Sequence, residues 1–327
     1  MDEFSLINSV KQPYYRQSSL LKGIGDDAAV FKERQDNIVI ATDVFVEDIH
    51  FSQKTMSPEQ VGYRALAVNL SDLAAMGAQP TFYMVAIVVP SKWKNKIKEI
   101  YEGMNKLALE YQIDLIGGDT VSGEQLTITI TVIGSVFPNS VRYRSHAKAS
   151  DIVFVTETLG DSRAGLHILQ TGKNYIEAEY FIQRHRYPKA RIKFAQSLTS
   201  IDRLALNDIS DGIISEAAEI ATESKVDIVI DESLIPISEH FYQFDKTLQR
   251  KWKLFGGEDF ELLGVTSISN WEKIKKLSEK TKTKVTKVGY TENPESMDAP
   301  GKVYLEENGR RTLILDRGYT HLNEEGD

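Results

Sequence analysis

Hydrophobic and polar positions alternate along parts of the chain in the way that β-strands require. The clearest case is Leu126–Val136, where Leu, Ile and Val alternate with Thr, so one face of the strand would be apolar. A continuous apolar run at Phe82–Val89 instead predicts a fully buried strand. Two further strands are expected in the N-terminal half, at residues 38–41 and 113–116.

Helix signals separate these strands. Ser57, Pro58 and Gln60 predict a helix start, because Ser57 can cap the helix, Pro58 suits its first turn and Gln60 can reach back to the cap. This helix is expected to end at Gly77. A second helix, with a lysine-rich outer face, is predicted over residues 93–111.

The C-terminal half alternates strands and helices loosely, so the expected class is α/β or α+β. The polar and basic stretch Pro138–Ser150 is interpreted as a boundary between domains of residues 1–140 and 150–327. Two domains also fit a length of 327 residues. Strands are expected at 152–155, 226–230, 260–265, 285–288, 303–305 and 312–315, and helices at 162–170, 177–183, 189–198, 213–223 and 270–280.

Composition and charge narrow the chemistry. The chain has no cysteine, which excludes disulfides, thiolate nucleophiles, iron–sulfur clusters and cysteine-type zinc sites, and fits a reducing compartment. Asp and Glu number 47 against 39 Lys and Arg, so the basic surface typical of nucleic-acid binding is missing. No apolar run approaches about 18 residues, and the first residues lack signal-peptide features. We therefore expect no nucleic-acid or membrane partner and a cytoplasmic location.

Aspartates beside small residues recur along the chain, most of them at the ends of predicted elements. They are Asp26 and Asp27 in a glycine-rich segment, Asp43 at the end of strand 38–41, Asp72 within the first helix, Asp119 after two glycines, and Asp208 and Asp211 in a predicted loop, 207–212. Taken singly, such a residue could occupy a turn or cap a helix. Five such sites in one acidic chain favour a shared site for a hard cation such as Mg²⁺ or Ca²⁺.

Asp72 is the most informative of these residues. Helical spacing places it on one face with Ala65, Val68 and Ala75, where an unpaired buried charge would cost at least several kcal/mol. No Lys or Arg follows one turn later, and Arg64 is too far back for a local pair, so a bound cation is a natural solution. Standard P-loop and protein-kinase motifs are absent. Spacing alone therefore predicts a metal and phosphate site and leaves the substrate open.

Seven segments carry a family resemblance. They are GIGDDAAVF (23–31), ATDVFVEDIHF (41–51), GYRALAVNLSDLAAMGAQP (62–80), GGDT (117–120), ISDG (209–212), FGGEDFEL (255–262) and RGYTH (317–321). Together, and in this order, they resemble the thiamine-monophosphate kinase family of the aminoimidazole-ribonucleotide-synthetase-like ATP-binding superfamily. The resemblance implies that ATP and thiamine monophosphate react, with several Mg²⁺ ions, to give thiamine diphosphate and ADP. Because bound Mg²⁺ could bridge and align the two phosphate groups, we expect direct transfer of the γ-phosphoryl group without a phosphoenzyme.

The resemblance also implies an architecture. The N-terminal domain would contain a mixed sheet with helices, bind ATP and Mg²⁺, and form a homodimer. The α/β C-terminal domain would complete the cleft for the nucleotide and the substrate.

Individual residues receive roles from the same resemblance. The implied metal ligands are Asp27, Thr42, Asp43, Asp72, Asp119, Asp208 and Asp211. The implied ATP contacts are Gly118, Asp119, Arg144, Ser210 and Tyr101, although the helical spacing of Tyr101 with Ile97 and Met104 also fits a core position. The implied substrate contacts are His50, Glu258 and Tyr319. No side chain is assigned a general acid or base role.

Two alternatives stay open. The chain could be another ATP-dependent enzyme of this superfamily, similar to aminoimidazole ribonucleotide synthetase, or a non-catalytic sensor that binds thiamine phosphates with Mg²⁺. The superfamily members that depend on cysteine or selenocysteine chemistry, selenophosphate synthetase and the hydrogenase-maturation dehydratase, are disfavoured because this chain has no cysteine.

Overall fold

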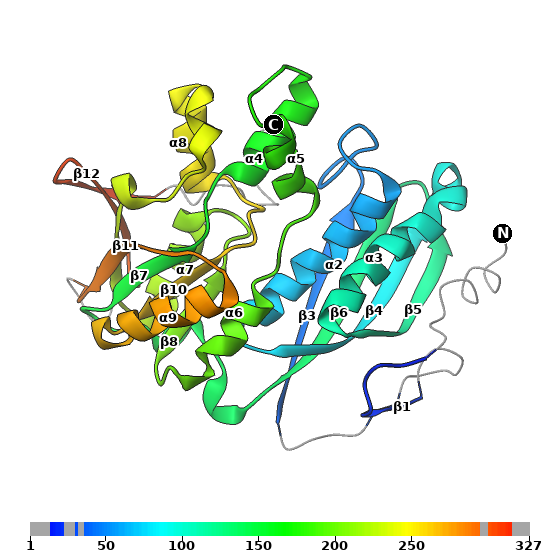
Figure 1. Cartoon of the computed structure of the whole chain (residues 1–327), viewed down its shortest axis with the longest axis horizontal. Helices are drawn as coiled ribbons and strands as arrows, with labels where there is room; N and C mark the ends of the chain where they lie inside the picture. Colours follow the sequence, from blue (N-terminus) through cyan, green and yellow to red (C-terminus); the bar gives the residue numbers. More distant parts are fainter. Residues whose placement is uncertain (1–13, 23–29, 32–35, 295–299, 316–327) are drawn as a thin grey trace. The chain divides into compact units, whose positions relative to one another are not determined.

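The computed structural model describes residues 14–22, 30–31, 36–294 and 300–315 (Figure 1). The chain divides into two compact units, one of residues 1–74 and 78–141 and the other of residues 75–77 and 142–327. Each unit has its own sheet and is described by itself. Two of the candidate residues, Asp27 and Tyr319, lie outside the described residues.

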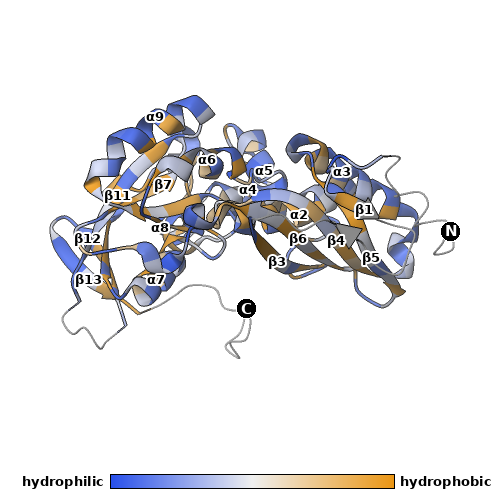
Figure 2. Ribbon diagram, turned by 90° about the horizontal axis from the view of Figure 1, so that it is seen from below, coloured by the Kyte–Doolittle hydropathy of each residue, from blue (hydrophilic) through white to orange (hydrophobic). Residues whose placement is uncertain are grey.

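The first unit is built on a four-stranded mixed sheet. Its elements are β1 (Leu20–Lys22), β2 (Val30–Phe31), β3 (Asn37–Val46), α2 (Pro58–Ala75), β4 (Gln79–Val89), the 3₁₀ helix η1 (Ser91–Lys96), α3 (Ile97–Tyr111), β5 (Asp114–Ser122), β6 (Thr127–Val136) and η2 (Pro138–Ser140). The strand order is β3-β6-β4-β5; β4 and β5 are parallel, and the other neighbours are antiparallel. Helices α2 and α3 cover one face of this sheet (Figures 1 and 2).

The start of α2 follows the predicted capping signal. The Ser57 N–H donates to Gln60 Oε1 at 2.8 Å, and the Gln60 N–H donates to Ser57 Oγ at 3.4 Å. These reciprocal bonds satisfy two N–H groups that the first helical turn leaves without intrahelical partners. The helix runs from Pro58 to Ala75, close to the predicted end.

Two strands of this unit are longer than predicted. β3 continues past Asp43 to Val46, because every residue from Asn37 onward pairs with β6. From the sequence, the polar residues Thr42 and Asp43 were expected to end the strand. Because successive side chains of a strand point to opposite faces of the sheet, the two residues fit within the longer strand. β5 likewise continues through the GGDT segment, where each residue pairs with β4.

Helices α2 and α3 approach closely at two glycines. A Cβ atom at Gly62 would lie 1.8 Å from the Ile100 carbonyl oxygen, and one at Gly103 would lie 1.9 Å from the Glu59 carbonyl oxygen. Only glycine permits such contact between the helix backbones. Since α2 carries Asp72, this contact helps to fix the position of that carboxylate.

The second unit contains a seven-stranded mixed sheet. Its helices and strands are β7 (Ile152–Thr156), α4 (Asp161–Thr171), α5 (Ala178–Arg186), α6 (Ile192–Ser197), β8 (Leu204–Asp208), α7 (Ile213–Ser224), β9 (Asp227–Asp231), α8 (Lys246–Phe255), β10 (Leu262–Thr266), α9 (Trp271–Thr281), β11 (Val285–Glu292), β12 (Val303–Glu307) and β13 (Arg310–Ile314). Its 3₁₀ helices are η3 (Arg144–His146), η4 (Leu198–Ser200), η5 (Glu232–Leu234), η6 (Glu239–Gln243) and η7 (Ile268–Asn270).

Strand order in this sheet is β13-β12-β9-β11-β7-β10-β8. Only the β12–β9 pair is parallel. Residues of α7 pack with those of the central strands in one hydrophobic core, and an aromatic cluster lies among α4, α5, η6 and α8. Figure 2 shows that hydrophobic segments concentrate in the strands. The mixed α/β class predicted from the sequence is confirmed.

One strand and one α-helix of this unit were not predicted. Strand β8 is buried throughout, and it includes Asn207 and Asp208, which the sequence analysis assigned to a loop. The two polar residues concealed the end of a strand that pairs with β10. Helix α8 begins after Asp245, whose carboxylate accepts the N–H groups of Thr247 and Leu248. None of the described helices is long and apolar enough to cross a membrane.

Candidate functional site

Strand β3 and helix α2 bring two predicted carboxylates together. The carboxyl groups of Asp43 and Asp72 lie within hydrogen-bond reach of each other. Asn69, one turn before Asp72, helps to position Asp43: its Oδ1 accepts the Asp43 N–H at 3.0 Å, and its Nδ2 donates to the Ala65 carbonyl at 2.9 Å. Burial raises the pKa of Asp43, while the bond to Asp72 and the charge of His50 act in the opposite direction.

This arrangement fits a divalent cation. Two carboxyl groups in contact need a shared proton or a cation between them, since two negative charges at this distance repel each other. Hard cations prefer such oxygen ligands. Within the described ranges, however, no group of three or more His, Asp or Glu side chains is close enough to hold a metal ion. The Asp43–Asp72 pair is therefore a partial site, and Asp27 is not described.

Thr42 lies beside Asp43 in the sequence, but its hydroxyl group contacts the neighbouring strand β6. Its Oγ1 donates to the Ile130 carbonyl at 3.0 Å and lies 3.1 Å from Thr131 Oγ1. Because side chains alternate along a strand, Thr42 and Asp43 face opposite sides of the sheet. The metal-ligand role predicted for Thr42 stays a prediction.

His50 follows β3 in a tight turn. Its Nδ1 accepts the Val46 N–H at 3.0 Å, and its ring stacks on Phe45 with centroids 5.5 Å apart. Because Nδ1 is an acceptor, the neutral ring carries its proton on Nε2. His50 thus presents a hydrogen-bond donor at Nε2.

Gly118 and Asp119 lie on the edge strand β5. The register aligns Gly118 with Val85 of β4, and a Cβ atom at Gly118 would lie 1.9 Å from the Val85 carbonyl oxygen. Asp119 aligns across the sheet with Val44, three strand spacings or about 14 Å away. Its Oδ1 accepts the Thr120 N–H at 2.9 Å. The described structure therefore does not bring Asp119 to the Asp43–Asp72 pair.

Tyr101 lies on α3 and interacts with Tyr83 of β4. Burial raises the pKa of Tyr101 to about 12. This setting agrees with the core position that helical spacing allowed for Tyr101. Its contact with ATP stays a prediction.

In the second unit, a buried glutamate organises the segment after β8. Glu216 of α7 is 3% exposed. Its Oε1 accepts the Asp211 N–H at 3.0 Å and the Ser210 hydroxyl at 3.2 Å, and its Oε2 accepts from Asn207 Nδ2 at 2.6 Å. Burial and the charge of Asp208 raise the pKa of Glu216 to about 9. Asp208, Ser210 and Asp211 are thus gathered around a residue that the sequence analysis missed.

Arg144 joins the same group through Asn207. Its Nε and Nη2 donate to Asn207 Oδ1 at 3.2 and 3.0 Å, and Nη2 pairs with Glu219 Oε2 at 2.9 Å. The Asn207 amide therefore accepts from Arg144 and donates to Glu216 and Glu219. This network fixes the orientation of the guanidinium.

The backbone of the FGGEDFEL segment (255–262) hydrogen-bonds to the segment that carries Ser210. The Glu258 N–H donates to the Ser210 carbonyl at 2.7 Å, and the Phe260 N–H donates to the Ile209 carbonyl at 3.0 Å. The second unit therefore brings together the predicted nucleotide, metal and substrate residues Arg144, Asp208, Ser210, Asp211 and Glu258.

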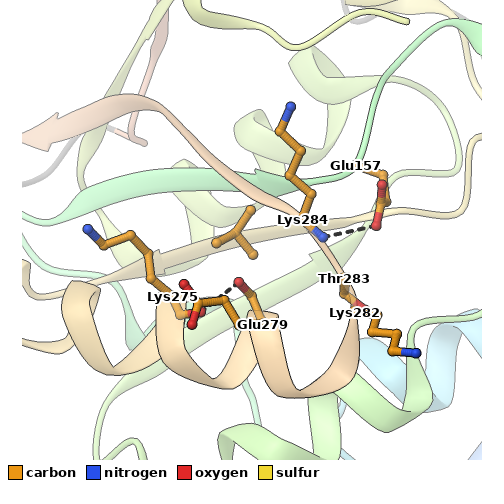
Figure 3. A pocket seen from close by; sticks show the side chains of 8 residues that line it. Glu157, Lys275, Glu279, Lys282, Thr283 and Lys284 are labelled. Atoms are coloured by element: carbon orange, nitrogen blue, oxygen red, sulfur yellow. Dashed lines mark hydrogen bonds between the residues drawn. The ribbon is translucent and has the colours of Figure 1, made fainter.

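A surface depression of about 470 Å³ lies elsewhere, beside α9. It is lined by Glu157, Lys275, Ser278, Glu279, Lys282, Thr283, Lys284 and Val285. Figure 3 shows that its three lysine side chains point in different directions. It contains none of the candidate residues, so we do not assign it to the site.

Comparison with known proteins identifies the class of this fold. Residues 25–136 match the family model described as AIR synthase related protein, N-terminal domain. The thiamine-monophosphate kinase of Stenotrophomonas maltophilia K279a has a similar crystal structure, with a TM-score of 0.83 and 29% identity over 95% of this chain and 98% of that chain. Residues 25–136 therefore resemble the N-terminal domain of AIR-synthase-related proteins.

The particular family follows from a full-length match. The chain is 44% identical to the thiamine-monophosphate kinase of Bacillus subtilis (strain 168), over 98% of this chain and 100% of that protein. It belongs to the thiamine-monophosphate kinase family. A solved structure described as AaThiL complexed with AMPPCP and TMP has a TM-score of 0.74 and 29% identity, over 95% of this chain and 94% of that chain.

Proposed function

We propose that this chain transfers the γ-phosphoryl group of ATP to thiamine monophosphate, giving thiamine diphosphate and ADP. The observation that carries the proposal is the match to a thiamine-monophosphate kinase at 44% identity over 98% of the chain. The related complex with AMPPCP and TMP supports an ATP-like nucleotide and thiamine monophosphate as the two substrates.

The nucleophile would be a phosphate oxygen of thiamine monophosphate. With a second pKa of about 6, this group is largely ionised at pH 7, so the chain needs no general base. The obstacle is charge repulsion between the two phosphate groups. Each pair of unit charges at 4 Å costs about 1 kcal/mol in water and about 4 kcal/mol at an effective dielectric of 20.

The proposed metal ligands divide between the two units. They are Asp27, Thr42, Asp43, Asp72 and Asp119 in the first, and Asp208 and Asp211 in the second. Bound Mg²⁺ would neutralise phosphate charge and align the reacting groups. In support of these roles, Asn69 holds Asp43 against Asp72, and Glu216 holds the segment that carries Asp208 and Asp211.

Substrate contacts form a second part of the proposal. Gly118, Asp119, Arg144, Ser210 and Tyr101 would contact ATP, and His50, Glu258 and Tyr319 would contact thiamine monophosphate. Residues 1–140 would form the ATP-binding and dimerisation domain, and residues 150–327 the domain that completes substrate binding.

The experiment that tests the activity is a turnover assay. ATP and thiamine monophosphate are incubated with the purified chain, with and without a chelator, and thiamine diphosphate is measured. We expect product that the chelator abolishes, with the label of γ-³²P ATP in the product and none on the protein. Binding of thiamine monophosphate without turnover would support the sensor instead, and absence of both would contradict the proposal.

The tautomer of His50 predicts how it contacts the substrate. In His50→Gln the amide can donate from near the former Nε2 position, whereas in His50→Asn it lies near Nδ1. We expect kcat/KM for thiamine monophosphate to be about tenfold higher for His50→Gln than for His50→Asn, since one hydrogen bond contributes about 1 kcal/mol. Steady-state kinetics check this, and a higher value for His50→Asn would refute the donor role.

We also propose that a second copy of the chain covers the open face of the four-stranded sheet. Exposed apolar side chains gather on this face, opposite α2 and α3: Ile38 (41% exposed), Ile40 (63%), Val44 (48%) and Val121 (48%). Exposed apolar side chains that gather on one face of a sheet are typical of interaction sites. In a homodimer this surface would be removed from water.

Substitution on this face should change the oligomeric state. We expect the wild type to sediment as a dimer and Ile40→Asp to shift it to monomer, because the dimer would bury an unpaired charge. Ile268→Asp is the matched control, since Ile268 is 61% exposed in the second unit and should leave the dimer intact. Sedimentation velocity decides, and a monomeric wild type would disprove the interface.

A further inference from the structure

The FGGEDFEL segment contains three acidic residues in different surroundings. Glu258 is half-buried, whereas Asp259 and Glu261 are 2% and 0% exposed. The proposed function uses only Glu258. Two buried carboxyl groups that contact neither substrate nor metal in that scheme need another explanation, because burying a carboxylate costs several kcal/mol unless it is fully paired.

Glu261 is held by three side chains. Its Oε2 accepts the Thr156 hydroxyl at 2.7 Å and Arg191 Nε at 2.6 Å, and its Oε1 accepts from Arg184 Nη2 at 2.8 Å and Arg191 Nη2 at 2.5 Å. The two bonds from Arg191 form a bidentate pair, which fixes direction as well as distance. Glu261 therefore ties the start of β10 to the end of β7, to α5 and to the residue before α6.

Asp259 is held by the start of α4. Its Oδ2 accepts the Gly160 N–H at 2.6 Å, and its Oδ1 accepts the Ser162 N–H at 3.1 Å. Arg184 links this contact to that of Glu261, because its Nε also lies 3.7 Å from the carboxylate of Asp161. Both buried carboxylates thus belong to one network around Arg184.

The backbone is strained at the residues that alternate with these two carboxylates. Glu258 and Phe260 have φ values of +70° and +51°, in the left-handed region that side chains other than glycine rarely adopt. Such conformations cost on the order of 1–3 kcal/mol each and persist only where the surroundings impose them. Asp259 and Glu261 alternate with the two strained residues, so each strained residue has an anchored neighbour.

Stability alone does not account for this network. Well-packed apolar residues are often as stabilising as a buried ion-pair network of the same volume, or more so. What fixed ion pairs add is geometry. We propose that Asp259 and Glu261, through Arg184 and Arg191, are positioning residues that hold Glu258 in the orientation required to bind the acceptor substrate. This inference rests on the proposed role of Glu258 in binding thiamine monophosphate.

The test compares the KM for thiamine monophosphate with the KM for ATP. A loss of positioning should raise only the first of these values, whereas a loss of stability should raise neither. Glu261→Gln keeps the size and removes the charge, and Arg191→Lys keeps the charge and removes the bidentate geometry. We expect each to raise the KM for thiamine monophosphate about tenfold or more, while the KM for ATP stays within about twofold, because a misplacement of about 1 Å costs up to about 100-fold.

Asp151→Asn is the matched control. Asp151 is 2% exposed and pairs with Arg203 at the opposite end of β7 from Thr156. The Asp151→Asn substitution should lower the melting temperature without changing the KM for thiamine monophosphate or for ATP. If Glu261→Gln and Arg191→Lys behave as this control does, with normal KM for thiamine monophosphate, the inference is wrong while the proposed function stands. A wild type without turnover would remove the proposed function and the inference with it.

Discussion

Asp72→Asn is expected to lower kcat by about 10²–10³-fold at limiting Mg²⁺, while the protein stays folded. Asn has nearly the same volume as Asp but no charge, so the substitution removes electrostatic stabilisation of developing phosphate charge, an effect of this order in other enzymes. Its melting temperature should be unchanged or higher, because the contact between Asp72 and Asp43 is repulsive when both are ionised. Thiamine diphosphate formation is measured against Mg²⁺ concentration, together with thermal unfolding.

An exposed aspartate supplies the control for this prediction. Asp202 lies on the surface of the second unit, where its Oδ1 accepts a hydrogen bond from Asn270 Nδ2, and it precedes β8 at the end opposite to Asp208. Asp202→Asn should retain wild-type turnover. Wild-type turnover of Asp72→Asn at limiting Mg²⁺ would show that Asp72 holds no functional cation.

The second large effect concerns the contact between α2 and α3. In an exposed helix, replacing Gly by Ala stabilises by up to about 1 kcal/mol. Gly62→Ala should have the opposite sign and lower the free energy of unfolding by about 2–3 kcal/mol, because the new Cβ would lie 1.8 Å from the Ile100 carbonyl oxygen. Urea denaturation measures the change.

Asn105→Ala, on the exposed face of α3, is the control for this substitution and should shift the free energy of unfolding by less than about 0.5 kcal/mol. If Gly62→Ala is as stable as the wild type, α2 and α3 do not need this close approach, and its role in positioning Asp72 has to be abandoned.

Local signals in the sequence predicted much of the fold. Ser57, Pro58 and Gln60 located the start of α2 because a capping box is a property of adjacent residues. Alternation located β6 for the same reason. Strand β8 was missed because its last two residues, Asn207 and Asp208, are polar, and their burial comes only from tertiary packing.

The candidate site shows the same division between local and tertiary information. A carboxylate on the apolar face of a helix predicted that Asp72 needs a partner, but spacing could not show that Asp43, on another element, lies beside it or that Asn69 accepts the Asp43 N–H. Glu216 was missed because a glutamate in the first turn of a helix is also common at the surface. Only the fold shows that this one is buried beside Asp208.

The measurement that most directly tests the account is a crystal structure with AMPPCP, thiamine monophosphate and Mn²⁺, with anomalous data to locate the metal. We expect Mn²⁺ peaks beside the phosphate oxygens of the bound ligands and on carboxylates that include Asp43, Asp72, Asp208 and Asp211. Both ligands bound with no Mn²⁺ on these aspartates would contradict it.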